Sequence, residues 1–481
     1  MKIAVIGAGP AGMTAAYEIS KRLGDNVDTL DLFEKSDRVG GLAKSIELWD
    51  QRVDLGPHRF FSHDARINSL WLEVVKEQYE IVDRQTRIYY KKKFFDYPIR
   101  PFNALKGLGI FEAVRCLLSY AGERLFPTRD TSTFEGWVTS RFGKRLYRIF
   151  FKTYSEKLWG IPCTELDSDF AAQRIKKLSL LEAIKNAFSR GIKNKHATLV
   201  DQFAYPTGGT GSVYESMQAM IESRGGHIHV NTGVQRVITR NGKAQSLQLE
   251  NGEIREYDHI ISSMPISLLV ERLPEVPKSV VALSKSLKFR NTILVYLRME
   301  RTDLFTDQWL YIHEKSLQMG WVTNFRNWVR QIYRDSESTI LCLEYWCYFE
   351  DRLWSLSPDQ LISLAKDEIA RTGLVDMKDV KEGYVERLPR CYPVYFRGYR
   401  ETMEPVEKYL SSVENLHVIG RYGAYKYNNQ DHSILMGMLA SENILEETGH
   451  NLWAINTDYE VYQEASIITK TGLVINKSGD Q

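Results

Sequence analysis

The first residues of the chain alternate between apolar runs and a helical pattern. Residues 2–6 are almost entirely apolar, which predicts a short buried strand. A glycine-rich turn and a helical stretch ending near Gly24 follow, and a second apolar run covers Thr29 to Glu34. A strand, a helix and a second strand in this order predict a βαβ unit, which is the usual beginning of a nucleotide-binding α/β fold.

The next part of the chain carries helical periodicity. Leu70, Trp71 and Val74 fit one apolar face of a helix, and only a strand-like run at residues 87–91 interrupts the pattern. We therefore expect residues 66–203 to form a mostly helical lobe that covers a substrate cleft.

The second half of the chain returns to strands. Runs between residues 234 and 263 indicate a meander that rejoins the first fold, and β-rich runs at 292–300 and 338–349 indicate an antiparallel sheet. A helix is expected from Ser433 to Glu447. The pattern predicts an α/β protein whose parts are a discontinuous Rossmann-type nucleotide-binding domain (1–65, 204–265 and 410–450), the helical lobe, an antiparallel-sheet substrate domain (266–409) and a peripheral tail (451–481).

Composition excludes some classes of function. The 481 residues carry a net charge of +2, which does not favour bulk nucleic-acid binding. The five cysteines form no CxxC pair, so we expect reduced thiols in a cytoplasmic protein and no metal site. The N-terminus does not resemble a signal peptide, and no apolar run approaches the length of a membrane span. The sequence leaves a homo-oligomer open.

The glycine-rich turn has the spacing of a dinucleotide-binding motif. Gly7, Gly9 and Gly12 match GxGxxG between a predicted strand and a predicted helix, and Glu34 ends the second strand. Gly9 lets backbone N–H groups approach a pyrophosphate, and the helix N-terminus favours its negative charge. Glu34 is expected to accept hydrogen bonds from the ribose hydroxyls.

A second glycine pair, Gly40 and Gly41, follows Glu34 closely. This arrangement resembles that of flavoproteins, in which the chain passes over the FAD pyrophosphate a second time, and Pro10 in the first turn points the same way. The resemblance implies FAD as the tightly bound nucleotide and adds Ala11, Lys35, Leu42 and Val234 to the expected FAD contacts.

Several further segments resemble UDP-galactopyranose mutase, a flavoenzyme that interconverts pyranose and furanose nucleotide sugars. The likeness extends from residue 1 to about 445. The segments that carry it are 54–62, 97–103, 133–137, 152–160, 205–211 and, as the most diagnostic, 420–433 (GRYGAYKYNNQDHS). The segment 205–211 is shared with the wider amine oxidase and protoporphyrinogen oxidase group.

The resemblance implies a role for particular residues. Arg421 and Tyr427 would hold the substrate diphosphate, and His58 would lie beside the flavin. A planar guanidinium and a phenol are also the partners that a diphosphate favours chemically. Further implied FAD contacts are Gly56, Pro57, Gly420, Asn429, Gln430 and Ser433. The implied substrate contacts are Tyr97, Arg100, Lys152, Tyr154, Trp159 and Tyr311, together with Arg421 and Tyr427; for Tyr154 and Trp159, packing in a helical core is an equal alternative.

One position departs from the family. The mutases carry a second diphosphate-binding arginine on a strand where this chain has Trp321, and Arg326 and Arg330 are the candidates to replace it. The nucleotide base and the sugar therefore stay open.

The resemblance implies a nucleotide-sugar mutase of surface polysaccharide synthesis. Its reaction proceeds through an adduct between reduced flavin N5 and the sugar, and it requires a reductant such as NAD(P)H. The first alternative is an oxidase or desaturase of the amine oxidase and protoporphyrinogen oxidase group, which would not need Arg421 and Tyr427 for a diphosphate. The second is a non-catalytic flavin-binding sensor.

Overall fold

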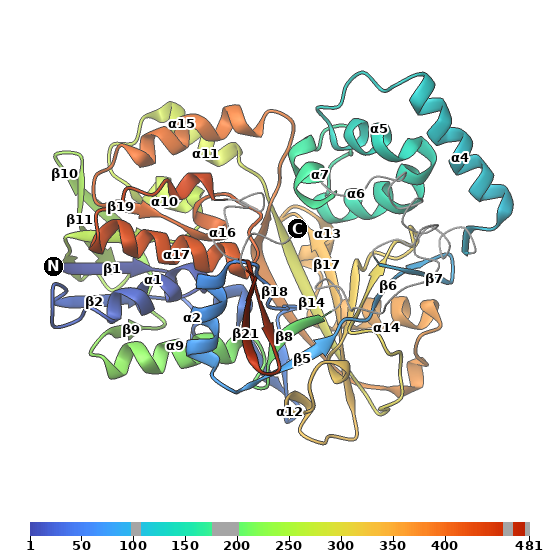
Figure 1. The fold of residues 1–481 in the computed structure, drawn as a ribbon, viewed down its shortest axis with the longest axis horizontal. Coiled ribbons are helices and arrows are strands. Elements are labelled where there is room, and N and C mark those ends of the chain that lie inside the picture. Colours follow the sequence, from blue (N-terminus) through green and yellow to red (C-terminus); the bar gives the residue numbers. More distant parts are fainter. Residues whose placement is uncertain (98–106, 176–201, 456–464, 477–481) are drawn as a thin grey trace.

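The computed structural model describes residues 1–97, 107–175, 202–455 and 465–476. Its first layer is a five-stranded, entirely parallel sheet with β1 at the centre (Figure 1). The strand order is β19 (Leu416–Val418), β13 (His259–Ser262), β1 (Lys2–Ile6), β2 (Thr29–Phe33) and β9 (His227–His229). The predicted α/β class with a Rossmann-type domain is confirmed.

Side chains of β1 alternate between two cores, as a sheet covered on both faces requires. Ile3 and Val5 pack with the helices on one face, and Ala4 and Ile6 pack toward the meander on the other face. The helices are α1 (Pro10–Ser20), α2 (Ala65–Val75), α9 (Gly211–Ser223) and α17 (Gln430–Leu445), and the meander is β10 (Val234–Arg240), β11 (Lys243–Leu249) and β12 (Ile254–Glu256).

The second layer is a seven-stranded sheet. Its order is β18 (Val380–Pro393), β14 (Phe289–Met299), β17 (Thr339–Cys347), β16 (Trp321–Asn324), β15 (Trp309–Ile312), β6 (Thr86–Tyr90) and β7 (Lys93–Asp96). The sheet is mixed and not purely antiparallel, because β6 pairs in parallel with β15. Helix α14 (Pro358–Thr372) packs against β14 and β18.

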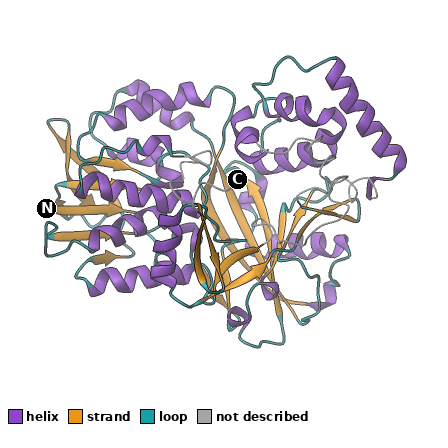
Figure 2. Cartoon of the chain, in the orientation of Figure 1, coloured by secondary structure: helices purple, strands orange, loops and turns teal. Residues whose placement is uncertain are grey.

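The helical lobe is smaller than the sequence predicts. Residues 66–97 contribute most of α2, strand β5 (Tyr79–Asp83) and the edge strands β6 and β7, in which β-branched and aromatic residues favour extended structure. Figure 2 shows the described helices of the lobe grouped apart from the strands. They are α4 (Ile110–Leu125), α5 (Phe134–Leu146), the π-helical turn η2 (Tyr147–Lys152), α6 (Thr153–Trp159) and α7 (Ser168–Ile175). Residues 98–106 and 176–201 of the predicted lobe lie outside the described residues.

The remaining elements connect and cover these layers. They are β3 (Ser45–Leu48), β4 (Gln51–Asp54), β8 (Gln202–Pro206), α10 (Ile266–Arg272), α11 (Lys278–Ser286), α12 (Arg330–Tyr333), α13 (Arg352–Ser355), α15 (Tyr399–Ser411) and α16 (Gly420–Gly423). In the tail, β20 (Ala465–Thr469) and β21 (Gly472–Asn476) form a hairpin against α2, where the Asn68 amide donates to Ser466 Oγ at 2.9 Å. None of the described helices has both the length and the apolar composition needed to cross a bilayer.

Buried Asp54 joins the two layers. Its carboxylate accepts hydrogen bonds from Ser45 Oγ at 2.5 Å and Tyr205 Oη at 2.7 Å, and its backbone carbonyl accepts from Tyr296 Oη of β14 at 2.8 Å. Because a buried carboxylate needs such partners, this network fixes the loop after β4 between the two sheets.

Helix α1 packs closely on the turn after β1 because Gly12 has no side chain. A Cβ on Gly12 would lie 2.0 Å from the Gly7 carbonyl oxygen, so Gly12→Ala forces the helix away from the turn. We expect thermal stability and FAD content both to fall, with a cost of about 1–3 kcal/mol typical of overpacking. The matched control is Gly122→Ala in α4, where a Cβ meets no atom within 4 Å; it is expected to leave the thermal midpoint unchanged or raise it. Equal midpoints for the two variants would contradict this packing.

Candidate functional site

A cavity of about 920 Å³ lies between the parallel sheet and the seven-stranded sheet. The turn after β1, the segment after β19 and strands β16, β17 and β18 all contribute to its walls. The carboxyl ends of β1, β13 and β19 open toward it, which is where α/β folds bind ligands. Its volume is at the upper end of the range for small-molecule sites.

The glycine turn forms one end of the cavity. Gly7 has a φ of +95°, which only glycine adopts readily, and a Cβ on Gly9 would meet open space. Gly12 does not line the cavity; its missing side chain instead permits the close approach of α1. A Cβ on Gly41 would lie 2.9 Å from Gly9 Cα, so the second glycine turn crosses directly over the first. Pro10, Ala11 and Leu42 line the cavity beside this crossing.

Glu34 also lines the cavity, and the backbone orients its carboxylate. Oε2 accepts a hydrogen bond from the Ala8 N–H, and Oε1 accepts one from the Ser36 N–H, both at 2.8 Å. Oε1 also accepts from Ser36 Oγ at 2.8 Å, so Oε2 is the oxygen that keeps a lone pair for a ligand hydroxyl. Lys35 and Val234 line the same end, and Lys35 pairs with Glu250 at 3.1 Å.

Helix α17 aims its N-terminus into the cavity. The helix begins at Gln430, three residues before the predicted start, so Gln430 lies in its first turn. The side-chain oxygen of Gln430, Oε1, accepts a hydrogen bond from Tyr214 Oη at 2.9 Å, but the buried side-chain nitrogen Nε2 has no hydrogen-bond partner among the described residues. An unpaired buried donor at a helix N-terminus suits the carbonyl and negative charge of a flavin ring. Asn429 and Ser433 line the cavity nearby.

The residues present fit FAD. The open turn at Gly9 and the α1 N-terminus suit the pyrophosphate, Glu34 suits the ribose, and Gln430 suits the ring. Pro57 and Gly420 also line the cavity, and Gly56 lies next to its wall.

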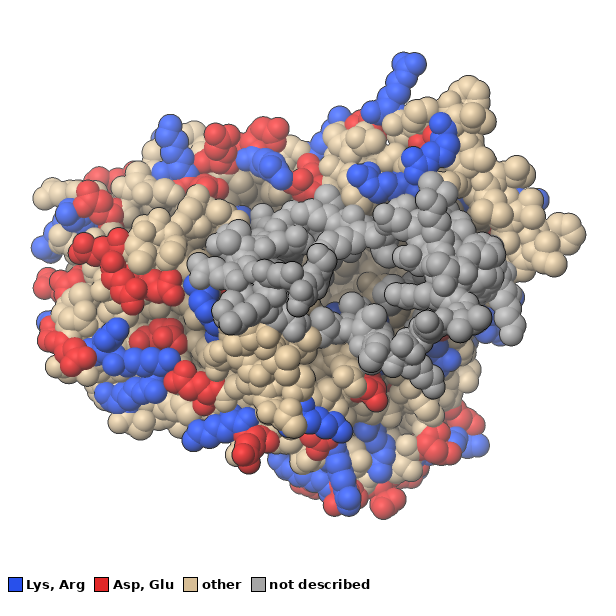
Figure 3. Space-filling view, viewed as in Figure 1, with Lys and Arg blue, Asp and Glu red and all other residues tan. Residues whose placement is uncertain are grey.

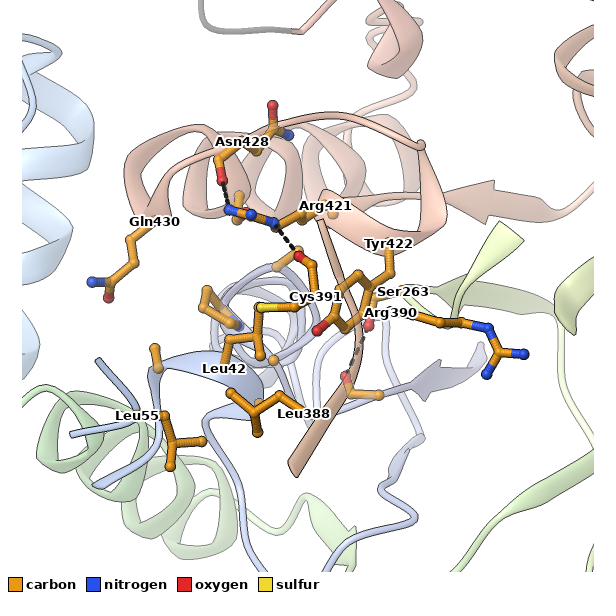
Figure 4. Close-up of a pocket in the computed structure, with 18 of the residues that line it drawn as sticks. Leu42, Leu55, Ser263, Leu388, Arg390, Cys391, Arg421, Tyr422, Asn428 and Gln430 are labelled. Atoms are coloured by element: carbon orange, nitrogen blue, oxygen red, sulfur yellow. Dashed lines mark hydrogen bonds between the residues drawn. The ribbon is translucent and has the colours of Figure 1, made fainter. Parts of the chain in front are cut away.

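Arg421 is held rigidly in the cavity wall (Figure 4). Its Nε donates to the Cys391 carbonyl and its Nη1 to the Asn428 carbonyl, both at 3.0 Å. Its Nη2 is buried and has no hydrogen-bond partner among the described residues. Two of the three guanidinium nitrogens, Nε and Nη1, are therefore engaged by backbone carbonyls, so Arg421 does not offer an anion a free pair of nitrogens. The nitrogen that remains for an anion is Nη2.

Two phenol rings support this guanidinium. The Arg421 Cζ atom lies 4.6 Å from the Tyr392 ring centre and 4.5 Å from the Tyr427 ring centre. The rings are 5.6 Å apart and inclined by 21°. Such stacking favours a desolvated cation and limits its movement. Figure 4 shows Leu42, Leu55 and Leu388 as an apolar wall below the Arg421 side chain.

Glu344 of β17 also lines the cavity, although it belongs to no motif of the sequence. Its Oε1 accepts from Trp346 Nε1 at 2.7 Å and from Tyr392 Oη at 2.9 Å. Burial raises the pKa of this carboxyl to about 7, against the opposing effect of these hydrogen bonds and of Arg421. The available signal was a lone acidic residue within the apolar strand TILCLEYWC.

His58 lies on the same side of the cavity as Glu344. A Cβ on the neighbouring Gly56 would lie 3.5 Å from Glu344 Oε2 and 4.0 Å from His58 Nε2. The His58 Nε2 atom is 3.0 Å from the Leu55 carbonyl, and burial lowers the pKa of the imidazole. A neutral ring is therefore favoured at neutral pH.

Some expected substrate contacts do not line the cavity. Lys152 pairs with Glu156 at 3.1 Å and is 43% exposed. Trp159 is a core residue that packs edge-on against Tyr427, and Tyr154 accepts a hydrogen bond from Trp321 behind the wall. Tyr154 and Trp159 face the core, because their aromatic side chains fill the space between α6 and the sheet. Arg100 lies outside the described residues.

The wall at Trp321 is aromatic, and neither proposed arginine replaces the missing cation. Arg326 donates to the Ser336 carbonyl at 2.6 Å and stacks on Tyr333, and Arg330 is exposed and pairs with Asp335. Neither residue lines the cavity, so neither candidate takes the place of the family arginine. The residues that do line this end are Tyr97, Tyr311, Trp309, Trp321, Arg59 and Arg84.

Comparison with known proteins agrees with this architecture. A solved structure of reduced UDP-galactopyranose mutase superposes with a TM-score of 0.81 and 23% identity, covering 93% of this chain and 96% of that one. Coproporphyrinogen III oxidase of Staphylococcus aureus is 24% identical over 55% of the chain, and a probable UDP-galactopyranose mutase of Klebsiella pneumoniae is 27% identical over 34%. The matches span only 60% and 42% of those two relatives.

The likeness to UDP-galactopyranose mutase that the sequence suggests is thereby confirmed for the fold. The family model for flavin-containing amine oxidoreductases matches residues 10–445, which is most of the chain. The proteins to which the chain is similar include both a mutase and oxidases, and the family's own description names the flavin. The chain is therefore a flavin-dependent member of the flavin-containing amine oxidoreductase family.

Proposed function

We propose that this flavoenzyme is a nucleotide-sugar mutase that interconverts the pyranose and furanose forms of its substrate. The observation that carries the proposal is the fixed guanidinium of Arg421: its buried Nη2 has no partner among the described residues, and the residue lines the cavity. Burying such a donor is costly unless a ligand pairs with it, and a diphosphate is the anion that a nucleotide sugar supplies.

The chain's own groups would position the leaving diphosphate. Arg421 would hold one phosphate oxygen, and the Tyr427 phenol, stacked beside it, would be the second donor. When bound and reduced, a flavin supplies an electron-rich ring nitrogen as the nucleophile toward the anomeric carbon. The reducing partner would be NAD(P)H or another external donor.

Trp321 changes how the second phosphate would be bound. With an indole in place of the family arginine, the cations that line this end of the cavity among the described residues are Arg59 and Arg84. Burial raises the pKa of Tyr311, and the positive charges of Arg59 and Arg84 oppose this rise, so both arginines lie near its phenol. Arg84 Nη2 also donates to the Tyr97 carbonyl at 3.3 Å. We infer that these arginines, with Tyr97 and Tyr311, bind the nucleotide-sugar end that the family arginine binds elsewhere.

An assay of the reduced enzyme tests this function. Dithionite-reduced protein is incubated with a panel of UDP- and GDP-hexopyranoses, and the products are separated for a new furanose. The proposal expects conversion of at least one sugar without net consumption of oxygen. Oxygen consumption with a porphyrinogen or amine substrate, and no furanose from any sugar, would instead indicate an oxidase such as the Staphylococcus aureus relative.

Removing the guanidinium should affect turnover but not the cofactor. For Arg421→Ala we expect kcat/KM to fall by roughly 10²–10³, because one preorganised donor to a developing anion is lost, while the FAD content stays at one per chain. Arg330→Ala removes an exposed arginine outside the cavity and is the matched control, with unchanged kinetics. If Arg421→Ala lost FAD in proportion to activity, Arg421 would hold the cofactor and not the substrate.

The raised pKa of Glu344 makes stability depend on pH. Because the folded pKa of about 7 exceeds the ordinary value of 4.5, the neutral carboxyl stabilises the fold at low pH, and this contribution is lost as the pH rises through 7. Between pH 5 and 8 the wild type should lose roughly 2–3 kcal/mol that Glu344→Gln retains.

Thermal unfolding with saturating FAD at both pH values measures this difference. Glu256→Gln alters an exposed carboxyl on β12 and serves as the control. Parallel pH dependence in the wild type and Glu344→Gln would show that the buried carboxyl does not titrate in this range.

A further inference from the structure

Helix α4 lies at the outer edge of the helical lobe (Figure 1). Its inner face is buried through Ala113, Cys116 and Tyr120, as in an ordinary packed helix. Its outer face carries large apolar side chains, among which Ile110 is 82% exposed and Phe111 is 89% exposed. We call this exposed set the α4 stripe; it consists of Ile110, Phe111, Val114, Leu117, Leu118, Leu125 and Phe126.

The α4 stripe is continuous and has basic edges. At 100° per residue, the stripe residues from Ile110 to Leu125 fall within about 120° of the helix circumference, on the side away from the buried face. Arg115 follows on one edge and Arg124 on the other, and both are exposed. Long basic side chains on either side of an apolar face are typical of a helix that lies in a membrane interface.

The surrounding lobe is positively charged. Residues 107–152, which span α4, α5 and η2, contain eight basic and four acidic residues, a net charge of +4; the described lobe as a whole, through Ile175, has a net charge of +2. All four carboxylates have partners: Glu112 pairs with Arg145, Glu135 accepts from the Tyr147 hydroxyl, Glu123 accepts from the Thr128 N–H, and Asp130 accepts from Ser132. Figure 3 shows basic side chains beside the broad tan surface of this lobe.

We propose that the α4 stripe docks the protein on an anionic lipid bilayer. Apolar side chains enter the acyl boundary, and the basic edges meet lipid phosphates, so both surface properties are satisfied by one partner. A second copy of the chain suits this surface less well. A two-fold contact through the stripe would bring the arginine edges of two stripes together, each within a segment (107–152) of net charge +4.

Vesicle sedimentation of the FAD-loaded full chain tests the docking surface. We expect at least tenfold more protein to sediment with phosphatidylglycerol–phosphatidylcholine vesicles than with pure phosphatidylcholine, and 0.5 M NaCl to reduce this binding. The double variant Phe111→Asp/Leu118→Asp should lose it by at least tenfold, and Arg115→Glu by a smaller factor.

The control replaces exposed apolar residues elsewhere. Ile254→Asp on β12 and Val474→Asp on β21 change side chains that are 57% and 44% exposed, and both should bind vesicles like the wild type. Unchanged FAD absorbance confirms that each variant is folded. Failure to bind anionic vesicles, or equal binding by the stripe variant, overturns the proposal. A wild-type dimer in ultracentrifugation that the stripe variant converts to monomers would assign the stripe to a second copy.

Discussion

The site depends on the immobilisation of one buried cation. Two backbone carbonyls, from Cys391 and Asn428, hold two nitrogens of Arg421, and its Cζ atom lies within 4.6 Å of the ring centres of Tyr392 and Tyr427. Because the cation is already desolvated and oriented, an anion that reaches the third nitrogen meets little reorganisation cost. The carbonyls come from β18 and from the segment before α17, so both sheets must be in place before the arginine is positioned.

That arrangement places demands on the rest of the fold. Asp54 fixes the loop after β4 between the two layers, and the Gly7–Gly12 contact sets how closely α1 approaches the parallel sheet. The cavity thus has a nucleotide-binding end built by close backbone packing and a second end built by aromatic side chains. The first end is suited to FAD, and the second end is where the proposed substrate would bind.

The features that could be predicted from the sequence are those whose residues lie close together in the chain. The βαβ unit, the glycine spacing and the signature around Arg421 are continuous in the chain, so pattern and resemblance suffice to place them. Glu344 and Tyr392 meet Arg421 only through the pairing of β14 with β17 and β18, and the partnership of β6 with β15 joins residues more than 200 apart. Whether Lys152 or Trp159 faces the cavity depends on how η2 and α6 are rotated against the sheet, which the spacing of apolar residues in a helix of seven residues does not fix.

A nucleotide titration tests the central claim most directly, because Trp309 and Trp321 line the cavity and report its occupancy. UDP is added to the FAD-loaded protein while indole fluorescence is followed, with Arg421→Ala measured in parallel at equal FAD content. The account predicts saturable quenching for the wild type and at least a tenfold weaker Kd for the variant. Quenching with the same Kd in both proteins, or no binding by either protein of UDP and of GDP titrated in the same way, would contradict the assignment of Arg421 to a diphosphate.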